Sequence, residues 1–313
     1  MTDNLQEIKL WLTEALPDIN IAGLRAAGSG FTCQSYIVNE EMLIKFPHKE
    51  SFASAVQKEI QALASLKGQG LKIPELISHG HLPNGLPFVC ESIIPGEIIG
   101  EKGFPLLPKE EQESLLVQIG ETVRQIHSVE VNNPYFPKAT VENRLQFVRD
   151  NYTDLIKKEL SAPENKLLLD LFAAYEGVFK DTPFVSVFSQ GDIFLENIMY
   201  DRKSKTITGL IDFGLAGYTD PYEDLYHFYP ADYVFLGKAS GLKMDRQGQL
   251  RVIFYCVSAS MDFLNVLAAE KRNYDIYLPY FHSYLADFQK WQNENDGIVK
   301  DYARIQTATR QYE

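Results

Sequence analysis

Cysteine and positive charge are both scarce in this chain. Its 313 residues contain three cysteines, Cys33, Cys90 and Cys256, which lie far apart and form no C-x-x-C pair. An odd number of widely spaced cysteines gives no sign of a disulfide framework or a structural zinc site. Lysine and arginine number 30 against 42 acidic residues, a net charge of −12. Nucleic-acid binding needs clustered basic residues, so we expect no nucleic-acid partner, although a cationic ligand is compatible with this charge.

A long uninterrupted apolar run is also missing. The most apolar stretch, residues 252–269, is interrupted by polar residues that include Ser258 and Asp262. A membrane span needs about 20 predominantly apolar residues. This stretch is therefore predicted to be a buried helix, and no membrane partner is expected. The first residues, 1–7, do not have the pattern of a signal peptide, so we expect a cytoplasmic protein.

The first 94 residues alternate in the manner of short strands around one helix. Apolar spacing predicts helices, and runs of β-branched and aromatic residues between glycine or proline turns predict strands. The expected helices are 5–15 and 51–67, and the expected strands are 19–30, 31–39, 42–46, 73–79 and 87–94. We place a domain boundary at Ile94–Pro95–Gly96, with residues 1–94 before it.

Residues 95–313 are mostly helical by the same criteria, which makes the fold class α+β. Helices are expected at 110–129, 141–160 and 164–179, within a helical insert at about 105–180, and again through 222–313. Two short strands, 184–189 and 207–213, are predicted to pair across the polar turn 201–205.

Chemistry is concentrated around these two strands. Gln190–Asn197 reads Q-G-D-I-F-L-E-N, and Gly209–Gly214 reads G-L-I-D-F-G. Phosphoryl transfer requires a group that orients the attacking hydroxyl and oxygen ligands that hold a metal against the phosphates. Asp192 is a candidate base, Asn197 can return an amide oxygen to the same loop, and Asp212 supplies a carboxylate.

The G-D-x-x-x-x-N element followed by I-D-F-G resembles the aminoglycoside phosphotransferase family, and the order of elements is most similar to the aminoglycoside 2″-phosphotransferases. The resemblance implies a bilobal protein-kinase-like fold, with a small mixed β-sheet N-lobe and a larger helical C-lobe. It also implies that Asp192 is the catalytic base and that Asn197 and Asp212 bind Mg²⁺. Asp220 and Asp224 match the D-P-x-x-D element, which would support the catalytic loop.

The upstream residues fit a nucleotide site under the same resemblance. Ser29 and Gly30 lie in a small-residue turn able to bring backbone N–H groups near phosphate. Lys45 interrupts an apolar strand, where a lysine needs a partner, and Glu59 on the following helix is the expected one. The resemblance makes Lys45 the phosphate-binding lysine of ATP or GTP.

The segment 88–97 resembles the interlobe hinge of the family and ends in P-G-E. Backbone groups from Glu91 to Ile93 would then contact the purine. His127, at a helix end, is interpreted as a structural histidine. The resemblance implies histidine directly before G-D, where this chain has Gln190; glutamine can still hydrogen-bond, so a modest effect is expected.

The acceptor is less sharply indicated. Glu196, Asp232 and Asp262 are candidate contacts for a cationic, aminoglycoside-like acceptor, but the stretch 226–235 is aromatic with Asp232 as its one carboxylate. Those rings could hold a sugar or an amine, although core packing is the favoured interpretation. The alternatives are a kinase of an amino alcohol, sugar or nucleoside-like metabolite, and a catalytically silent nucleotide-binding protein. A monomer or weak dimer is expected.

Overall fold

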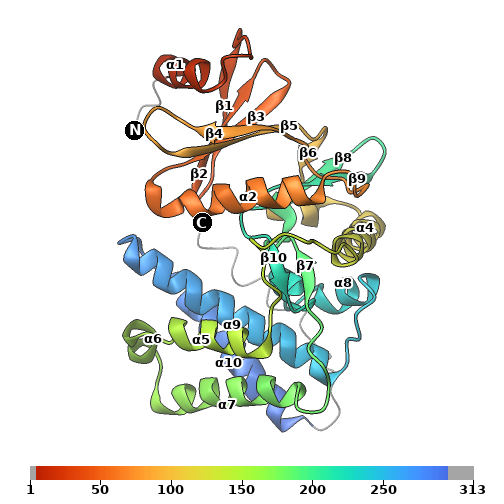
Figure 1. The fold of residues 1–313 in the computed structure, drawn as a ribbon. Coiled ribbons are helices and arrows are strands. Elements are labelled where there is room, and N and C mark those ends of the chain that lie inside the picture. The colour runs from red at the N-terminus through yellow and green to blue at the C-terminus, as the bar shows by residue number, and fades with distance from the viewer. Residues whose placement is uncertain (1–4, 295–313) are drawn as a thin grey trace. The chain divides into compact units, whose positions relative to one another are not determined.

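The structure is a computed structural model that describes residues 5–294 (Figure 1). Its contacts divide the chain into two compact units. Of the described residues, the first unit contains 5–115, 128–137 and 188–217, and the second contains 116–127, 138–187 and 218–294. Segment 188–217, which holds the G-D-x-x-x-x-N and I-D-F-G elements, thus shares a unit with the N-terminal strands. The boundary expected near residue 94 divides the chain differently and stays a prediction.

Five antiparallel strands form the main sheet of the first unit, in the order β1-β2-β3-β5-β4. They are β1 (Leu24–Ser29), β2 (Cys33–Val38), β3 (Met42–Pro47), β4 (Leu76–His81) and β5 (Pro87–Ser92). All five strands were predicted, and for β1, β2 and β5 the predicted range was longer than the observed strand. Because side chains alternate along a strand, Ile44 and Phe46 of β3 lie on one face of the sheet and Lys45 on the other.

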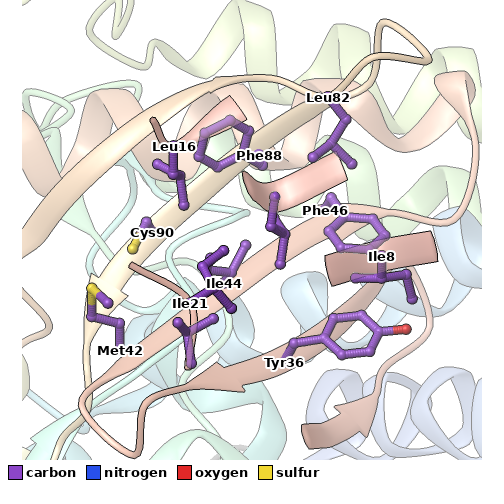
Figure 2. Packing of buried hydrophobic residues seen from close by; sticks show 12 residues of the cluster. Ile8, Leu16, Ile21, Tyr36, Met42, Ile44, Phe46, Leu82, Phe88 and Cys90 are labelled. Atoms are coloured by element: carbon purple, nitrogen blue, oxygen red, sulfur yellow. The ribbon is translucent and has the colours of Figure 1, made fainter. Parts of the chain in front are cut away.

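One face of this sheet packs against α1 (Leu5–Ala15), a helix with the predicted bounds. Figure 2 shows Ile8 of this helix in the same cluster as Phe46 and Phe88. The rings of Tyr36 and Phe46 stack with their centroids 5.4 Å apart. Each large apolar side chain buried in this way contributes about 1.5–3 kcal/mol, so this cluster anchors the sheet.

The helix α2 (Ala53–Leu66) follows a short 3₁₀ turn, Glu50–Phe52, and packs against β3 and β5. Val56 and Ile60 are buried, as the amphipathic spacing predicted. Glu59 is buried as well, with 2% exposure. A carboxylate on the covered side of a helix requires a partner, and its partner determines the site described below.

A second sheet of the first unit has the order β6-β8-β9. Its strands are β6 (Glu97–Ile98), β8 (Ile198–Asp201) and β9 (Thr206–Leu210). The predicted pairing of 184–189 with 207–213 is wrong: β9 pairs with β8, and β7 (Val187–Ser189) pairs with β10 (Gly217–Thr219). The Asp201 carboxylate accepts hydrogen bonds from Lys203 N (2.9 Å) and Ser204 Oγ (2.9 Å), which closes a tight hairpin between adjacent segments.

The second unit is helical. Its helices are α5 (Val141–Asn151), α6 (Asp154–Glu159), α7 (Ala162–Val178), α8 (Tyr233–Ala239), α9 (Arg246–Ala269) and α10 (Leu278–Asn293), with the 3₁₀ segment η4 (Glu223–Phe228). The elements α3 (Gly100–Gly103) and η2 (Phe104–Leu106) belong to the first unit, and α4 (Lys109–His127) runs from the first unit into the second.

The single helix predicted at 141–160 is wrong, because the chain leaves the helical path between α5 and α6. At this break Thr153 Oγ1 donates to Asn265 Oδ1 (2.6 Å), and Asn265 Nδ2 donates to the carbonyl of Asn151 (2.9 Å). Tertiary hydrogen bonds to α9 thus replace helical ones. The α7 helix begins with a capping box between Ser161 and Glu164.

The helix α9 has the buried character predicted for 252–269 and packs against α5, α7 and α10. Within residues 5–294 it is the one helix long and apolar enough to cross a membrane by length and composition. However, 56% of its apolar window is buried inside the protein, and the core helix of a soluble protein meets the same criterion. Burial against neighbouring helices accounts for its composition.

Candidate active site

The loop with the G-D-x-x-x-x-N element begins after Gln190, the residue that directly follows β7. Gly191 has a φ of 86°, in the left-handed region that favours glycine. A Cβ at this position would also collide with the carbonyl oxygen of Leu215. The hydroxyl of Ser189 accepts a hydrogen bond from Gly191 N (2.8 Å). The glycine before Asp192 is therefore required by both backbone conformation and space.

Asp192 and Asn197 lie together, as the five-residue spacing predicted. Asn197 Nδ2 donates to Asp192 Oδ2 (3.0 Å) and to the carbonyl oxygen of Asp192 (2.9 Å). Asn197 is buried, whereas Asp192 is partly exposed. These bonds fix the orientation of the carboxylate and use the amide nitrogen, so the amide oxygen takes no part in them.

Gln190 connects this loop to the segment that carries Asp212. Its side chain is fully buried and uses both ends of the amide. Nε2 donates to the carbonyl oxygens of Ile211 (2.9 Å) and Asp212, and Oε1 accepts from Asp192 N (2.8 Å). Glutamine does hydrogen-bond here, as predicted, and it ties the backbone of Asp192 to that of Asp212.

Asp212 follows β9 with a φ of 63°, an unusual value for a residue other than glycine. Its side chain is exposed, and Oδ1 accepts from Gly214 N (3.4 Å). Carboxylate and amide oxygens are the hard ligands that Mg²⁺ prefers, so the chemistry of Asp212 and Asn197 fits this ion. Within residues 5–294, no group of three or more His, Cys, Asp or Glu side chains forms a metal site by itself. A metal here would need further oxygen ligands, such as phosphates.

Lys45 and Glu59 form the buried ion pair that the sequence predicted. Lys45 Nζ donates to Glu59 Oε1, and the same oxygen accepts from Phe213 N (3.1 Å). Glu59 thereby links the lysine of β3 to the segment that carries Asp212. Burial alone would lower the pKa of Lys45, but Glu59, Glu91 and Asp212 outweigh it and hold that pKa well above its usual value. The lysine remains a cation.

The side chain of Glu91 was not predicted to matter, because the sequence indicated only backbone contacts around it. It is 1% exposed, and its Oε1 lies 3.1 Å from Lys45 Nζ. Apart from this ion pair with Lys45, no donor within residues 5–294 binds either of its carboxylate oxygens. Burial raises the pKa of Glu91, against the opposing effect of Lys45. The sequence signal was a glutamate inside an otherwise apolar strand.

The turn between β1 and β2 contains Ser29 and Gly30, both exposed. Gly30 N donates to the carbonyl of Cys33 (2.9 Å), which closes the turn. His48, a residue that the sequence analysis did not single out, lies 3.0 Å from the Gly30 carbonyl oxygen and 3.4 Å from Ser29 Oγ through Nε2. Its backbone N–H also donates to the carbonyl of Thr32 (2.9 Å), so His48 holds the turn at several points.

The segment after β5 includes Ile93, which is exposed, and Gly96, which has a φ of 118°. A Cβ on Gly96 would lie 2.8 Å from the carbonyl oxygen of Tyr200, so the glycine of P-G-E is required by close packing. Nearby, Glu196 Oε1 accepts from Glu101 N (2.8 Å) at α3, and its Oε2 is buried. Glu196 thus binds the backbone of α3, which follows the hinge segment. The sequence analysis assigned Glu196 to the acceptor and did not predict this hydrogen bond.

Asp220, Asp224, Asp232 and Asp262 belong to the second unit. Asp220 is fully buried and accepts hydrogen bonds from Arg251 and from Tyr175 (3.1 Å). Asp224 Oδ2 lies 2.7 Å from His127 Nε2, which confirms that His127 is hydrogen-bonded.

The candidate acceptor carboxylates Asp232 and Asp262 are partly buried, and burial raises the pKa of each. Asn151 opposes that shift at Asp262 through a hydrogen bond. Three aromatic residues near Asp232, namely Phe228, Tyr229 and Tyr233, are buried. Core packing, the favoured interpretation of these rings, is therefore confirmed for them.

Residues 23–250 match the Phosphotransferase enzyme family, and this segment covers more than half of the chain. The chain belongs to that family. Membership makes it a phosphotransferase-type protein, as the G-D-x-x-x-x-N and I-D-F-G elements indicated.

Several solved structures of aminoglycoside phosphotransferases share the fold. The GDP complex of wild-type aminoglycoside 2'-phosphotransferase-IIIa is 21% identical, with a TM-score of 0.78 over 93% of this chain and 100% of that one. The GDP and kanamycin complex of APH(2")-IIIa has a TM-score of 0.75 at 21% identity, over 92% of this chain and 99% of that one. ADP-bound APH(2'')-Ib has a TM-score of 0.67 at 18% identity, over 91% of this chain and 97% of that one. The predicted α+β, protein-kinase-like fold is confirmed.

A curated relative matches a smaller part of the chain. Altered inheritance of mitochondria protein 9, mitochondrial, from Candida tropicalis (strain ATCC MYA-3404 / T1), is 25% identical over 186 residues. The match covers 50% of this chain and 30% of the relative. The chain therefore spans less than a third of the length of that protein.

Proposed function

We propose that this family member transfers the γ-phosphate of ATP or GTP to a hydroxyl group of an aminoglycoside-like small molecule. The observation that carries the proposal is the connection of two segments by Gln190, which ties the backbone of Asp192 to that of Asp212. A candidate base and a candidate metal ligand are thereby held in one loop system. The nucleotides and kanamycin named in the related structures support the choice of co-substrate and acceptor.

In this mechanism Asp192 orients the acceptor hydroxyl and takes its proton. The hydroxyl oxygen forms a bond to the γ-phosphorus while the bond between that phosphorus and the β–γ bridging oxygen breaks, and the nucleoside diphosphate leaves. Asn197 holds the Asp192 carboxylate in place through its amide nitrogen. Lys45, fixed by Glu59, binds the phosphates of the nucleotide.

Mg²⁺ would be held by Asp212 and by the amide oxygen of Asn197, and it would neutralise charge on the phosphates. Ser29 and Gly30 would approach the phosphates from the β1–β2 turn, and the backbone from Glu91 to Ile93 would contact the purine. Asp220 and Asp224, the acids of the D-P-x-x-D element, would serve as structural support for the catalytic loop.

The acceptor is the finer part of the proposal. A polycationic aminoglycoside suits the net charge of −12 and the carboxylates Asp232 and Asp262. Glu196 is the weakest candidate contact, because one of its oxygens already accepts from Glu101 N. The protein is expected to act in the cytoplasm as a monomer or weak dimer, without nucleic acid or membrane.

A coupled nucleotide-consumption assay tests the proposal. ATP and GTP would be supplied separately with Mg²⁺, against a panel of aminoglycosides and of amino-alcohol, sugar and nucleoside-like metabolites, with Asp192→Asn as the inactive control. Turnover that depends on an aminoglycoside supports the full proposal. Turnover with a metabolite alone replaces the acceptor, and nucleotide binding without turnover on any acceptor would indicate a catalytically silent protein.

A further inference from the structure

Lys45 has two carboxylate neighbours, and they are held very differently. Glu59 reaches it from α2 and is fixed by a second donor, Phe213 N. Glu91 reaches it from β5 at 3.1 Å, and no second donor within residues 5–294 binds its oxygens. A buried carboxylate whose one partner is a lysine already bound by another carboxylate is costly, so its presence calls for a physical explanation.

The strand register explains how Glu91 reaches the lysine. In the antiparallel pair β3–β5, Leu43 lies opposite Glu91 and Lys45 lies opposite Val89. Lys45 and Glu91 are thus diagonal neighbours on one face of the sheet, within reach of long side chains. The opposite face carries the apolar cluster of Figure 2, and α2 packs against both strands. Glu91 cannot turn to solvent without leaving this layer.

This cluster contains more acidic groups than basic ones. One cation, Lys45, interacts electrostatically with three carboxylates, those of Glu59, Glu91 and Asp212. Glu59 connects Lys45 to the segment 212–213, and Asp212 is exposed and suited to a metal. Glu91 has neither role, and it adds negative charge where the proposed function brings the phosphates of a nucleotide. At short range in a buried site, such repulsion is only weakly screened.

We propose that Glu91 is an anionic competitor for Lys45, which pairs with the lysine when the phosphates are absent and weakens nucleotide binding. This inference rests on the proposed function, because it assumes that Lys45 binds nucleotide phosphates. Glu59 and Glu91 therefore act in opposite directions on the same lysine. Glu59 positions Lys45 for the phosphates, whereas Glu91 sets a limit on affinity and favours release of the product nucleotide.

The test is a set of binding titrations with ADP and GDP in the presence of Mg²⁺, on the full chain and its variants. Glu91→Gln and Glu91→Met remove the charge and nearly keep the side-chain size. Each is expected to lower the nucleotide Kd by about tenfold, the scale of one unscreened charge near the site. Glu59→Gln is expected to raise the Kd. Both Glu91 variants should also melt at a higher temperature without nucleotide, because a desolvated charge is removed.

Glu75→Gln is the matched control. Glu75 is exposed, and its backbone exchanges hydrogen bonds with Ser92 beside Glu91, so this variant makes the same change in net charge nearby but outside the cluster. It should leave the Kd unchanged. Equal or weaker nucleotide binding by the Glu91 variants, or failure of both to fold, overturns the inference. If the unaltered protein binds neither nucleotide, the proposed function itself is wrong.

Discussion

Each unit contains a buried cluster of charged side chains, and the two clusters differ in how fully they are satisfied. In the second unit, Asp220 is fully buried and is bound by the guanidinium of Arg251, the hydroxyl of Tyr175 and the backbone N–H of Tyr222. Arg251 is in turn stacked over the Tyr222 ring at 3.9 Å. The Asp220 carboxylate thus faces one cation, Arg251, and each of its oxygens accepts hydrogen bonds.

The cluster of the first unit lacks this balance. Lys45 faces both Glu59 and Glu91, and apart from Lys45 no donor within residues 5–294 binds the carboxylate of Glu91. A satisfied buried network rigidifies a fold, whereas an unsatisfied one is kept where a ligand or a reaction uses it. The comparison suggests that the Asp220 cluster mainly supports stability and that the Lys45 cluster serves ligand binding. The following experiments test that division.

The largest expected effect is on catalysis. Asp192→Ala should reduce kcat by about a thousandfold, within the range for removal of a general base, because it removes the carboxylate to which Asn197 donates. Nucleotide binding should be retained, since Asp192 acts on the acceptor. Single-turnover kinetics and a nucleotide titration measure the two properties separately. Near-normal turnover by this variant would remove Asp192 from the mechanism.

The second unit should respond mainly in stability. Asp220→Ala leaves the guanidinium of Arg251, with 14% side-chain exposure, without its carboxylate. Breaking a buried pair in this way costs about 3–5 kcal/mol, which urea denaturation would measure. Asp170→Ala, which breaks the exposed pair with Lys166, is the control and should cost at most about 0.5 kcal/mol. Similar losses in both variants would contradict a structural role for Asp220.

Gln190 tests the connection inside the first unit. Gln190→Ala removes the hydrogen bonds to the carbonyls of Ile211 and Asp212 and to Asp192 N. Leaving these buried groups unpaired should destabilise the protein by about 1–3 kcal/mol and lower kcat more than it changes nucleotide affinity. Gln190→His, the residue that the family resemblance implies, should restore part of kcat. Equal kcat values in the alanine and histidine variants would argue against a positioning role.

The smallest effect concerns Asp232 and pH. Burial raises the pKa of Asp232 above its ordinary value of 3.8, so the folded state holds the proton more tightly than the unfolded state. The stabilising contribution of the neutral acid is present below pH 3.8 and is lost as the pH rises through the raised pKa. Asp232→Asn should therefore be slightly more stable than the parent protein at pH 7, and the gain should shrink toward pH 4. Thermal melts of both proteins at pH 7 and pH 4 measure this gain in stability. A gain that is larger at pH 4 than at pH 7 would contradict the predicted direction.

Much of the fold follows from local sequence patterns. The spacing of Ile8 and Leu12 predicted α1, and the apolar run 42–46 before Pro47 predicted β3, with Lys45 as a lysine in need of a partner. The strand pairing did not follow, because β8 is short and its hairpin with β9 is closed by the side chain of Asp201. The break between α5 and α6 depends on Asn265, which is more than a hundred residues away.

The sequence by itself determined the proximity of Asp192 and Asn197, because five residues of one loop connect them. It also indicated the Lys45–Glu59 pair, since a lysine in a buried strand needs a nearby acid. Only the tertiary structure decided that Gln190 joins two segments and that Glu91 reaches Lys45. The physical reason is that burial and electrostatic interaction depend on strand register and on the helix that covers the sheet, and residues distant in sequence set both.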